Sequence, residues 1–116
     1  MTKFEIIAKL SENRDEFRKI RNSCAEWLKK EVEHELSERQ IGEYQKYIAV
    51  CYFYVDVIEK VANDSELKDA LLAVTLERLF KESFIKPRNP IQQGLYLYEL
   101  EGYKIAAKTI ANDFGL

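Results

Sequence analysis

The sequence predicts an all-α protein: a compact helical bundle of one short and four long helices, in a single domain spanning residues 1–116. Only four glycines and two prolines interrupt the chain, and apolar residues recur at helical spacing through most of it. Apolar residues make up 47% of the chain and charged residues 33%, a balance typical of globular rather than disordered proteins. A chain of this length can bury a core without a disulfide or a structural metal.

The first third of the chain is expected to hold a short helix followed by a long one. Thr2 with Glu5 fits a capping box that starts the short helix, and Asn13 with Glu16 fits the start of the next. The long helix is expected to end near Leu36. Its predicted apolar stripe consists of Phe17, Ile20, Cys24, Trp27, Leu28 and Val32.

Residues 38–63 are predicted to form the central helix, which Ser37 and Gln40 begin as another capping box. Its apolar residues form a pair of stripes that together cover roughly 200° of the circumference, at about 100° per residue. A helix with so wide an apolar arc needs neighbours on two sides, so we expect it to be innermost. The stripes are Ile41, Tyr44, Ile48, Cys51, Val55, Ile58 and Ala62, and Tyr47, Val50, Tyr54, Val57 and Val61.

A leucine-rich fourth helix is expected to begin at Asp64 or Ser65 and to end near Ile85. Pro87 and Pro90 follow it and predict a stiff corner, because proline cannot continue a helix. The corner leads into the last helix without separating two domains.

The last helix is predicted over residues 90–112, with Pro90 at its first turn and Gly115 at its stop. It is two-faced like the central helix, so we expect these helices to be the innermost pair. Gly102 interrupts one face. A glycine within a helix costs about 1 kcal/mol relative to alanine, so its presence predicts the close approach of another backbone.

Charge and composition narrow the expected partners and compartment. The 18 basic and 20 acidic residues are well mixed and give a net charge of −2, which disfavours nucleic acid and anionic lipid as partners. Neither a signal peptide nor a membrane span is evident, so we expect a cytoplasmic protein. Cys24 and Cys51 fall on apolar helix faces, and we expect them to be reduced and structural.

Catalytic and metal-binding patterns are weak. Glu31 and His34 match the Glu-x-x-His spacing of di-iron bundles, but that chemistry needs a second histidine and His34 is the only one in the chain. A thiolate pair of His34 with Cys24 or Cys51 is disfavoured by the apolar surroundings of both cysteines. Glycine-rich phosphate loops and nucleophile elbows are missing from the sequence. We therefore predict no metal, no cofactor, no small-molecule substrate and no enzymatic activity.

A basic edge supports an alternative function in nucleic-acid binding. Arg14, Arg18 and Arg21 follow one side of the second predicted helix at i, i+4 and i+7. Asp15 and Glu16 interrupt this edge, however, and solvated helices with internal ion pairs commonly look like this. Nucleic acid is therefore the second choice among possible partners.

The placement of the tyrosines supports the first choice, a protein partner. All seven lie in the central and last predicted helices, and Tyr52 and Phe53 are expected to project into an otherwise polar strip beside Lys46, Asp56 and Lys60. Tyrosine combines a large apolar body with a polar tip, which suits surfaces that are buried only in a complex. The alternative is that these aromatics are ordinary core or rim residues.

The sequence thus favours a non-enzymatic protein–protein interaction or assembly module, with a homo-oligomer as the expected form. Small helical chains without catalytic residues are typical of phage or mobile-element accessory and virion proteins. The expected class includes such proteins, although no motif identifies one.

Overall fold

The computed structural model describes residues 2–30, 38–63 and 90–115, and all three stretches are helical. The helices are α1 (Lys3–Lys30), α2 (Glu38–Asn63) and α4 (Pro90–Phe114). Within these stretches no strand is present, which confirms the all-α class. The predicted fourth helix and residues 87–89 of the predicted corner lie outside the described residues, while Pro90 begins α4 as expected.

α1 is a single helix, so the predicted division into a short and a long helix at Asn13 is wrong. The region around Asn13 has no glycine or proline, and Ile6, Leu10 and Phe17 continue one apolar face across it. The Asn13 side chain does not cap a helix but donates a hydrogen bond to the Asp113 carboxylate of α4. The Asn13 side chain, which the local pattern predicted to be a helix cap, is instead used in a tertiary contact.

The start of α1 and the end of α4 follow their local signals. Thr2 Oγ1 accepts a hydrogen bond from the Glu5 N–H and donates one to the Glu5 carboxylate, both at 3.1 Å, which confirms the cap at Thr2. α4 extends two residues beyond the predicted end at 112 and stops at Gly115, whose φ of 68° is left-handed. The bounds of α2 match the predicted 38–63.

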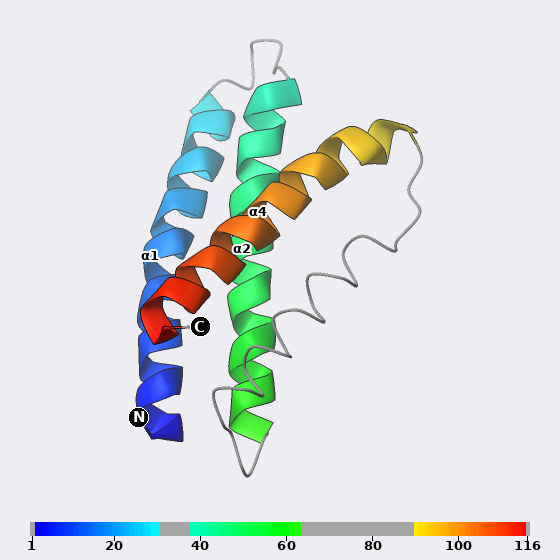
Figure 1. The fold of residues 1–116 in the computed structure, drawn as a ribbon. Coiled ribbons are helices and arrows are strands. Elements are labelled where there is room, and N and C mark those ends of the chain that lie inside the picture. The colour runs from blue at the N-terminus through cyan, green and yellow to red at the C-terminus, as the bar shows by residue number, and fades with distance from the viewer. Residues whose placement is uncertain (1, 31–37, 64–89, 116) are drawn as a thin grey trace.

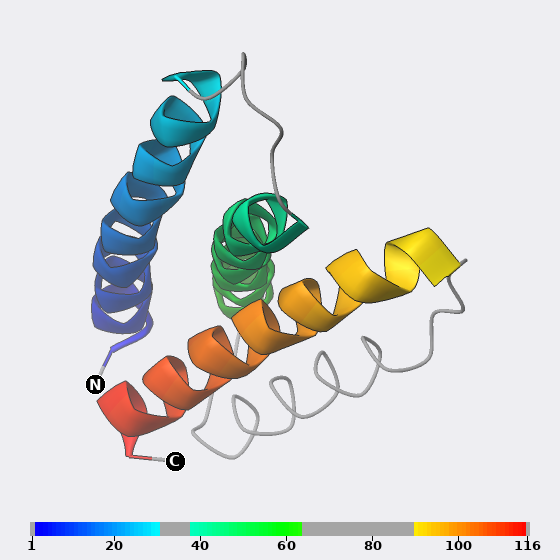
Figure 2. The ribbon, with the colours of Figure 1, turned by 90° about the horizontal axis from the view of Figure 1, so that it is seen from above.

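α2 lies at the centre of the described helices, as Figure 1 shows, with α1 antiparallel to it and α4 crossing it obliquely. Figure 2 shows that α1 and α4 occupy different sides of α2. α4 keeps one side in solvent, where Leu97, Glu101 and Lys108 are exposed, while its Leu100, Ala106 and Ile110 are buried. Whether α4 is innermost relative to the predicted fourth helix involves residues outside those that the structure describes. No helix of the described stretches is apolar over a length that would cross a membrane.

The core lies where the three helices converge. It contains Ile6, Leu10, Val50, Phe53, Tyr54, Val57, Val61, Ala106 and Ile110. The C-terminal end of α4 is fixed to α1 at this point, because Lys9 Nζ donates to the Asp113 carbonyl at 3.2 Å and lies over the Phe114 ring. Phe17 of α1 packs against Tyr54 of α2, with ring centroids 5.7 Å apart.

The crossing of α2 and α4 is built on glycines. A Cβ atom on Gly102 would collide with the carbonyl oxygen of Lys46 and lie 3.0 Å from the Ala49 Cβ, so the predicted close backbone approach at Gly102 is confirmed. A Cβ atom on Gly42 would collide with the ring of Tyr98. The absence of side chains at these points lets the helices touch.

Candidate functional site

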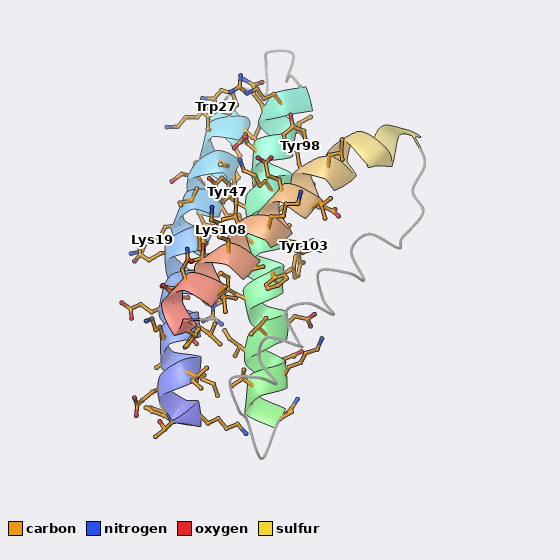
Figure 3. All side chains as sticks on the ribbon, viewed as in Figure 1. Lys19, Trp27, Tyr47, Tyr98, Tyr103 and Lys108 are labelled. Carbon is orange, nitrogen blue, oxygen red and sulfur yellow. The ribbon has the colours of Figure 1, made fainter. Side chains whose placement is uncertain are left out.

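The C-terminal half of α1 is less covered than its N-terminal half. Within α1 the buried residues are Ile6 and Leu10, both in the first third of the helix. Further along the predicted stripe, Ile20 is 42% exposed and Trp27 is 41% exposed. Figure 3 shows Trp27 near the end of α1, well away from the end that α4 crosses. We call the line of contact between α1 and α2 the α1–α2 seam, and its upper part is the part toward the C-terminal end of α1. This upper part therefore presents apolar surface to solvent.

A hollow of about 310 Å³ opens along one side of this seam, and we call it the Arg–Tyr groove. Its lining residues are Arg18, Arg21 and Asn22 of α1, and Tyr44, Ile48, Cys51, Tyr52 and Val55 of α2. Tyr52 is 68% exposed and Val55 is 38% exposed, so both offer apolar area at the rim. At 3.6 residues per turn these α2 residues lie on the side of the helix away from the Lys46–Gly102 crossing with α4.

The α1 wall of the groove is basic. Arg21 donates to the side chain of its neighbour Asn22 at 3.0 Å and has no carboxylate partner among the described residues. Arg14 and Arg18 lie 3.2 Å and 3.7 Å from Asp15, the carboxylate that interrupts the edge in sequence. Both pairs lie within one helix and involve the exposed Asp15 carboxylate, so each is worth at most about 1 kcal/mol. The guanidinium groups are therefore available to a ligand.

Another hollow, of about 320 Å³, lies on the opposite side of the seam. Its lining residues are Ile20, Ser23, Cys24, Trp27, Gln40 and Glu43. It contains a large exposed aromatic but lacks the basic wall of the Arg–Tyr groove.

The predicted interaction residues do not form one surface. Tyr52 is exposed in the Arg–Tyr groove, but Phe53 is only 3% exposed and packs against Tyr103 of α4 with ring centroids 5.9 Å apart. Figure 3 shows the Tyr103 side chain between α4 and α2. The expectation that Phe53 breaks the polar side of the helix is therefore wrong, because α4 covers the side to which Phe53 points.

The charged members of the predicted surface are also divided. Lys46 lies at the α4 crossing, where its Nζ is 2.9 Å from the Glu43 carboxylate. Burial lowers the pKa of Lys46, but the hydrogen bond and charge of Glu43, together with the charges of Tyr47 and Glu101, outweigh it and hold the pKa above its ordinary value. Asp56 is exposed and Lys60 is partly exposed, and neither lines the groove.

The structure instead joins residues that the sequence assigned to rival functions. Arg18 and Arg21, expected to contact nucleic acid, line the same groove as Tyr52, expected to contact protein. Arg14 lies close enough to act electrostatically on Cys51 at the groove floor. Sequence reasoning missed Tyr44 and Ile48 as groove residues because their helical spacing placed them in a core stripe. An antiparallel pairing of the helices would have brought the arginine edge opposite that stripe.

The two thiols are held in the protonated form. Burial raises the pKa of Cys51 above its usual value, and the nearby Arg21, Arg18 and Arg14 offset only part of that effect. Burial and the charge of Glu43 likewise raise the pKa of Cys24. Protonated thiols are poor nucleophiles, so the arrangement favours binding over thiolate chemistry at neutral pH.

Metal ligands do not gather in the described part of the chain. There, no three His, Cys, Asp or Glu side chains lie close enough to hold a metal ion. His34 and Glu31, the candidates for the di-iron pattern, lie outside the described residues. No family model matches the chain, and neither a curated protein nor a solved structure matches it.

Proposed function

We propose that this chain is a non-enzymatic protein–protein interaction module that binds its partner in the Arg–Tyr groove. The observation that carries the proposal is the exposure of Tyr52 and Val55 at the rim of a hollow whose other wall is formed by Arg18 and Arg21. Tyrosine and arginine are enriched at the energetic centres of protein interfaces, where each combines apolar contact with directed hydrogen bonds. The α1–α2 seam thus has the residue types of an interface and an open surface on which to use them.

Site-specific crosslinking tests this proposal. Tyr52 is replaced by the photoreactive residue p-benzoylphenylalanine in cells that make the protein, with the same replacement at exposed Lys108 of α4 as the control. We expect a discrete adduct from position 52 and none from position 108. Equal labelling at both positions, or none at position 52, would contradict the proposal.

Self-association is the form of the proposal that the sequence analysis favoured. Light scattering of the purified protein at micromolar concentration distinguishes it from binding to a different chain. A dimer that Tyr52→Ser converts to a monomer would assign the groove to a homo-oligomer. A monomer that still crosslinks at position 52 in cells would assign it to a different protein.

Binding of single-stranded nucleic acid is the second candidate, because an exposed tyrosine beside guanidinium groups can stack on a base and contact phosphates. The net charge of −2 and the Asp15 carboxylate beside Arg14 and Arg18 weigh against it. This function predicts binding that weakens steeply with salt and is lost when Arg14, Arg18 and Arg21 are changed to Glu. No binding to single-stranded DNA or RNA at low salt would exclude it.

A further inference from the structure

We infer that the segment recognised by the Arg–Tyr groove is an amphipathic helix with an acidic edge beside its apolar stripe. This inference rests on the proposed function and specifies the chemistry of the partner. It draws on the charge of the groove wall, the apolar character of its floor, and the spacing of both along the antiparallel helices α1 and α2.

The positive charge of the groove wall favours an acidic partner. Among the described residues, no carboxylate lines the groove, whereas Arg18 and Arg21 both do. Arg21 has only the uncharged Asn22 side chain as a partner, and Arg18 is 3.7 Å from Asp15. A carboxylate of the partner can therefore pair with either guanidinium without breaking a strong internal ion pair. The planar guanidinium also matches both oxygens of a carboxylate, which a lysine cannot do.

The floor selects an apolar stripe on the same partner. On α2, Ile48 and Cys51 lie in the floor, Tyr44 continues the same line at one end, and Val55 and Tyr52 stand at the rim. The uncharged thiol of Cys51 adds to the apolar surface. A fully acidic segment would leave this floor in contact with water, so the partner must carry apolar side chains beside its carboxylates.

Spacing selects a helix. Arg14, which acts electrostatically on Cys51 without lining the groove, advances with Arg18 and Arg21 about 10.5 Å along α1. Ile48 and Val55 advance the same distance along α2. A helix lying along the seam repeats its side chains at this interval, with acids at i, i+4 and i+7 and apolar residues on the adjoining face. The hollow of about 310 Å³ is at the lower end of the range for ligand sites, and it suits a few inserted side chains.

Designed peptides test the inference directly. The probe is a fluorescent helical peptide with a leucine stripe and three Glu residues at i, i+4 and i+7, compared with otherwise identical peptides carrying Gln or Lys. By fluorescence anisotropy at physiological salt, we expect the Glu peptide to bind about tenfold tighter than the Gln peptide, equivalent to about 1.4 kcal/mol. The Arg18→Glu/Arg21→Glu variant should reverse the order and prefer the Lys peptide.

The matched control is the Lys104→Glu/Lys108→Glu variant, which makes the same change in net charge on the exposed face of α4. It should keep the preference of the natural protein for the Glu peptide. Circular dichroism of each variant establishes that the helices are retained.

The remaining outcomes separate failure of the inference from failure of the proposed function. If Glu and Gln peptides bind equally and Tyr52→Ser abolishes both, the acidic partner is wrong but the groove remains the interface. A Tyr52-dependent dimer that binds no peptide also overturns the acidic helix and assigns the groove to a second copy. If a single-stranded oligonucleotide binds and none of the peptides does, both the inference and the protein-binding function are overturned. No binding of any probe at high micromolar concentration, without a dimer, overturns the inference.

Discussion

The contacts of α2 with α4 and with α1 are built differently. At the α2–α4 crossing, Gly102 brings the backbones together and the Tyr98 ring lies over Gly42, so little space is left between the helices. Along the α1–α2 seam, larger side chains hold the helices, and hollows open on both sides of it. Beyond the converging core, this seam keeps Ile20 partly in water.

The difference indicates which contact is structural and which is available for binding. At the α2–α4 crossing the backbones touch at Gly102, so no ligand can enter between the helices, and folding already buries this surface. A seam with an exposed tyrosine, an exposed valine and guanidinium groups that make only weak contacts within α1 retains surface that a partner can cover. We therefore expect mutations at the crossing and at the converging core to change stability, and mutations along the upper seam to change binding.

The largest expected effect is on the free energy of unfolding, and it comes from comparing substitutions in the two halves of α1. Leu10 is fully buried, so Leu10→Ala should lower the free energy of unfolding by about 2–5 kcal/mol. Ile20→Ala removes a side chain of the same composition from the half-exposed part of the seam and should cost about 1 kcal/mol or less. Urea denaturation measures both. Equal losses would mean that the upper seam is as well packed as the core, which would break the comparison.

The next prediction concerns the loss of stability when each of the two glycines at the α2–α4 crossing is changed to alanine. Gly102→Ala places a Cβ against a backbone carbonyl, which cannot move without shifting α2, and should destabilise the fold by about 1–3 kcal/mol. Gly42→Ala meets the Tyr98 ring, which can rotate away, so its loss should be smaller. Thermal denaturation of the two variants gives the order. A Gly102→Ala variant as stable as the natural protein would show that the crossing can relax.

The smallest effect concerns a buried hydroxyl at the converging core. Burial and the charge of Asp113 raise the pKa of Tyr54, and the contact with Asn13 offsets only part of this. The hydroxyl has no hydrogen bond of ordinary geometry, and the Asn13 amide beside it donates to the Asp113 carboxylate. At neutral pH, Tyr54→Phe should therefore be neutral or stabilising by up to about 1 kcal/mol.

The same substitution predicts a pH dependence. In the unfolded chain Tyr54 loses its proton near pH 10, whereas in the folded protein it keeps the proton to higher pH. Stability from this group is therefore complete below about pH 10 and falls as the pH rises beyond it. Tyr54→Phe should lose less stability than the natural protein between neutral pH and about pH 11 in urea titrations. Tyr52→Phe is the matched control, because that hydroxyl is exposed; parallel curves for Tyr54→Phe would contradict the prediction.

Local sequence signals predicted the helix ends correctly where capping residues and helical periodicity determine them. Thr2 caps α1, Gly115 ends α4, and the bounds of α2 agree with the sequence. The division of α1 failed at Asn13 because a polar side chain serves equally well as a cap or as a donor to a distant carboxylate. Nothing in the local sequence around Asn13 reveals that Asp113 will lie beside it.

The site shows the same division between local and tertiary information. The sequence by itself determined the helical class, the extent of α2, the close contact at Gly102, and the arginine edge of α1. Only the tertiary structure decided that α4 covers Phe53 while Tyr52 stays exposed, and that Arg18 and Arg21 lie opposite Tyr52. Helical periodicity fixes which residues share a face, but the relative rotation of the packed helices determines which face is covered.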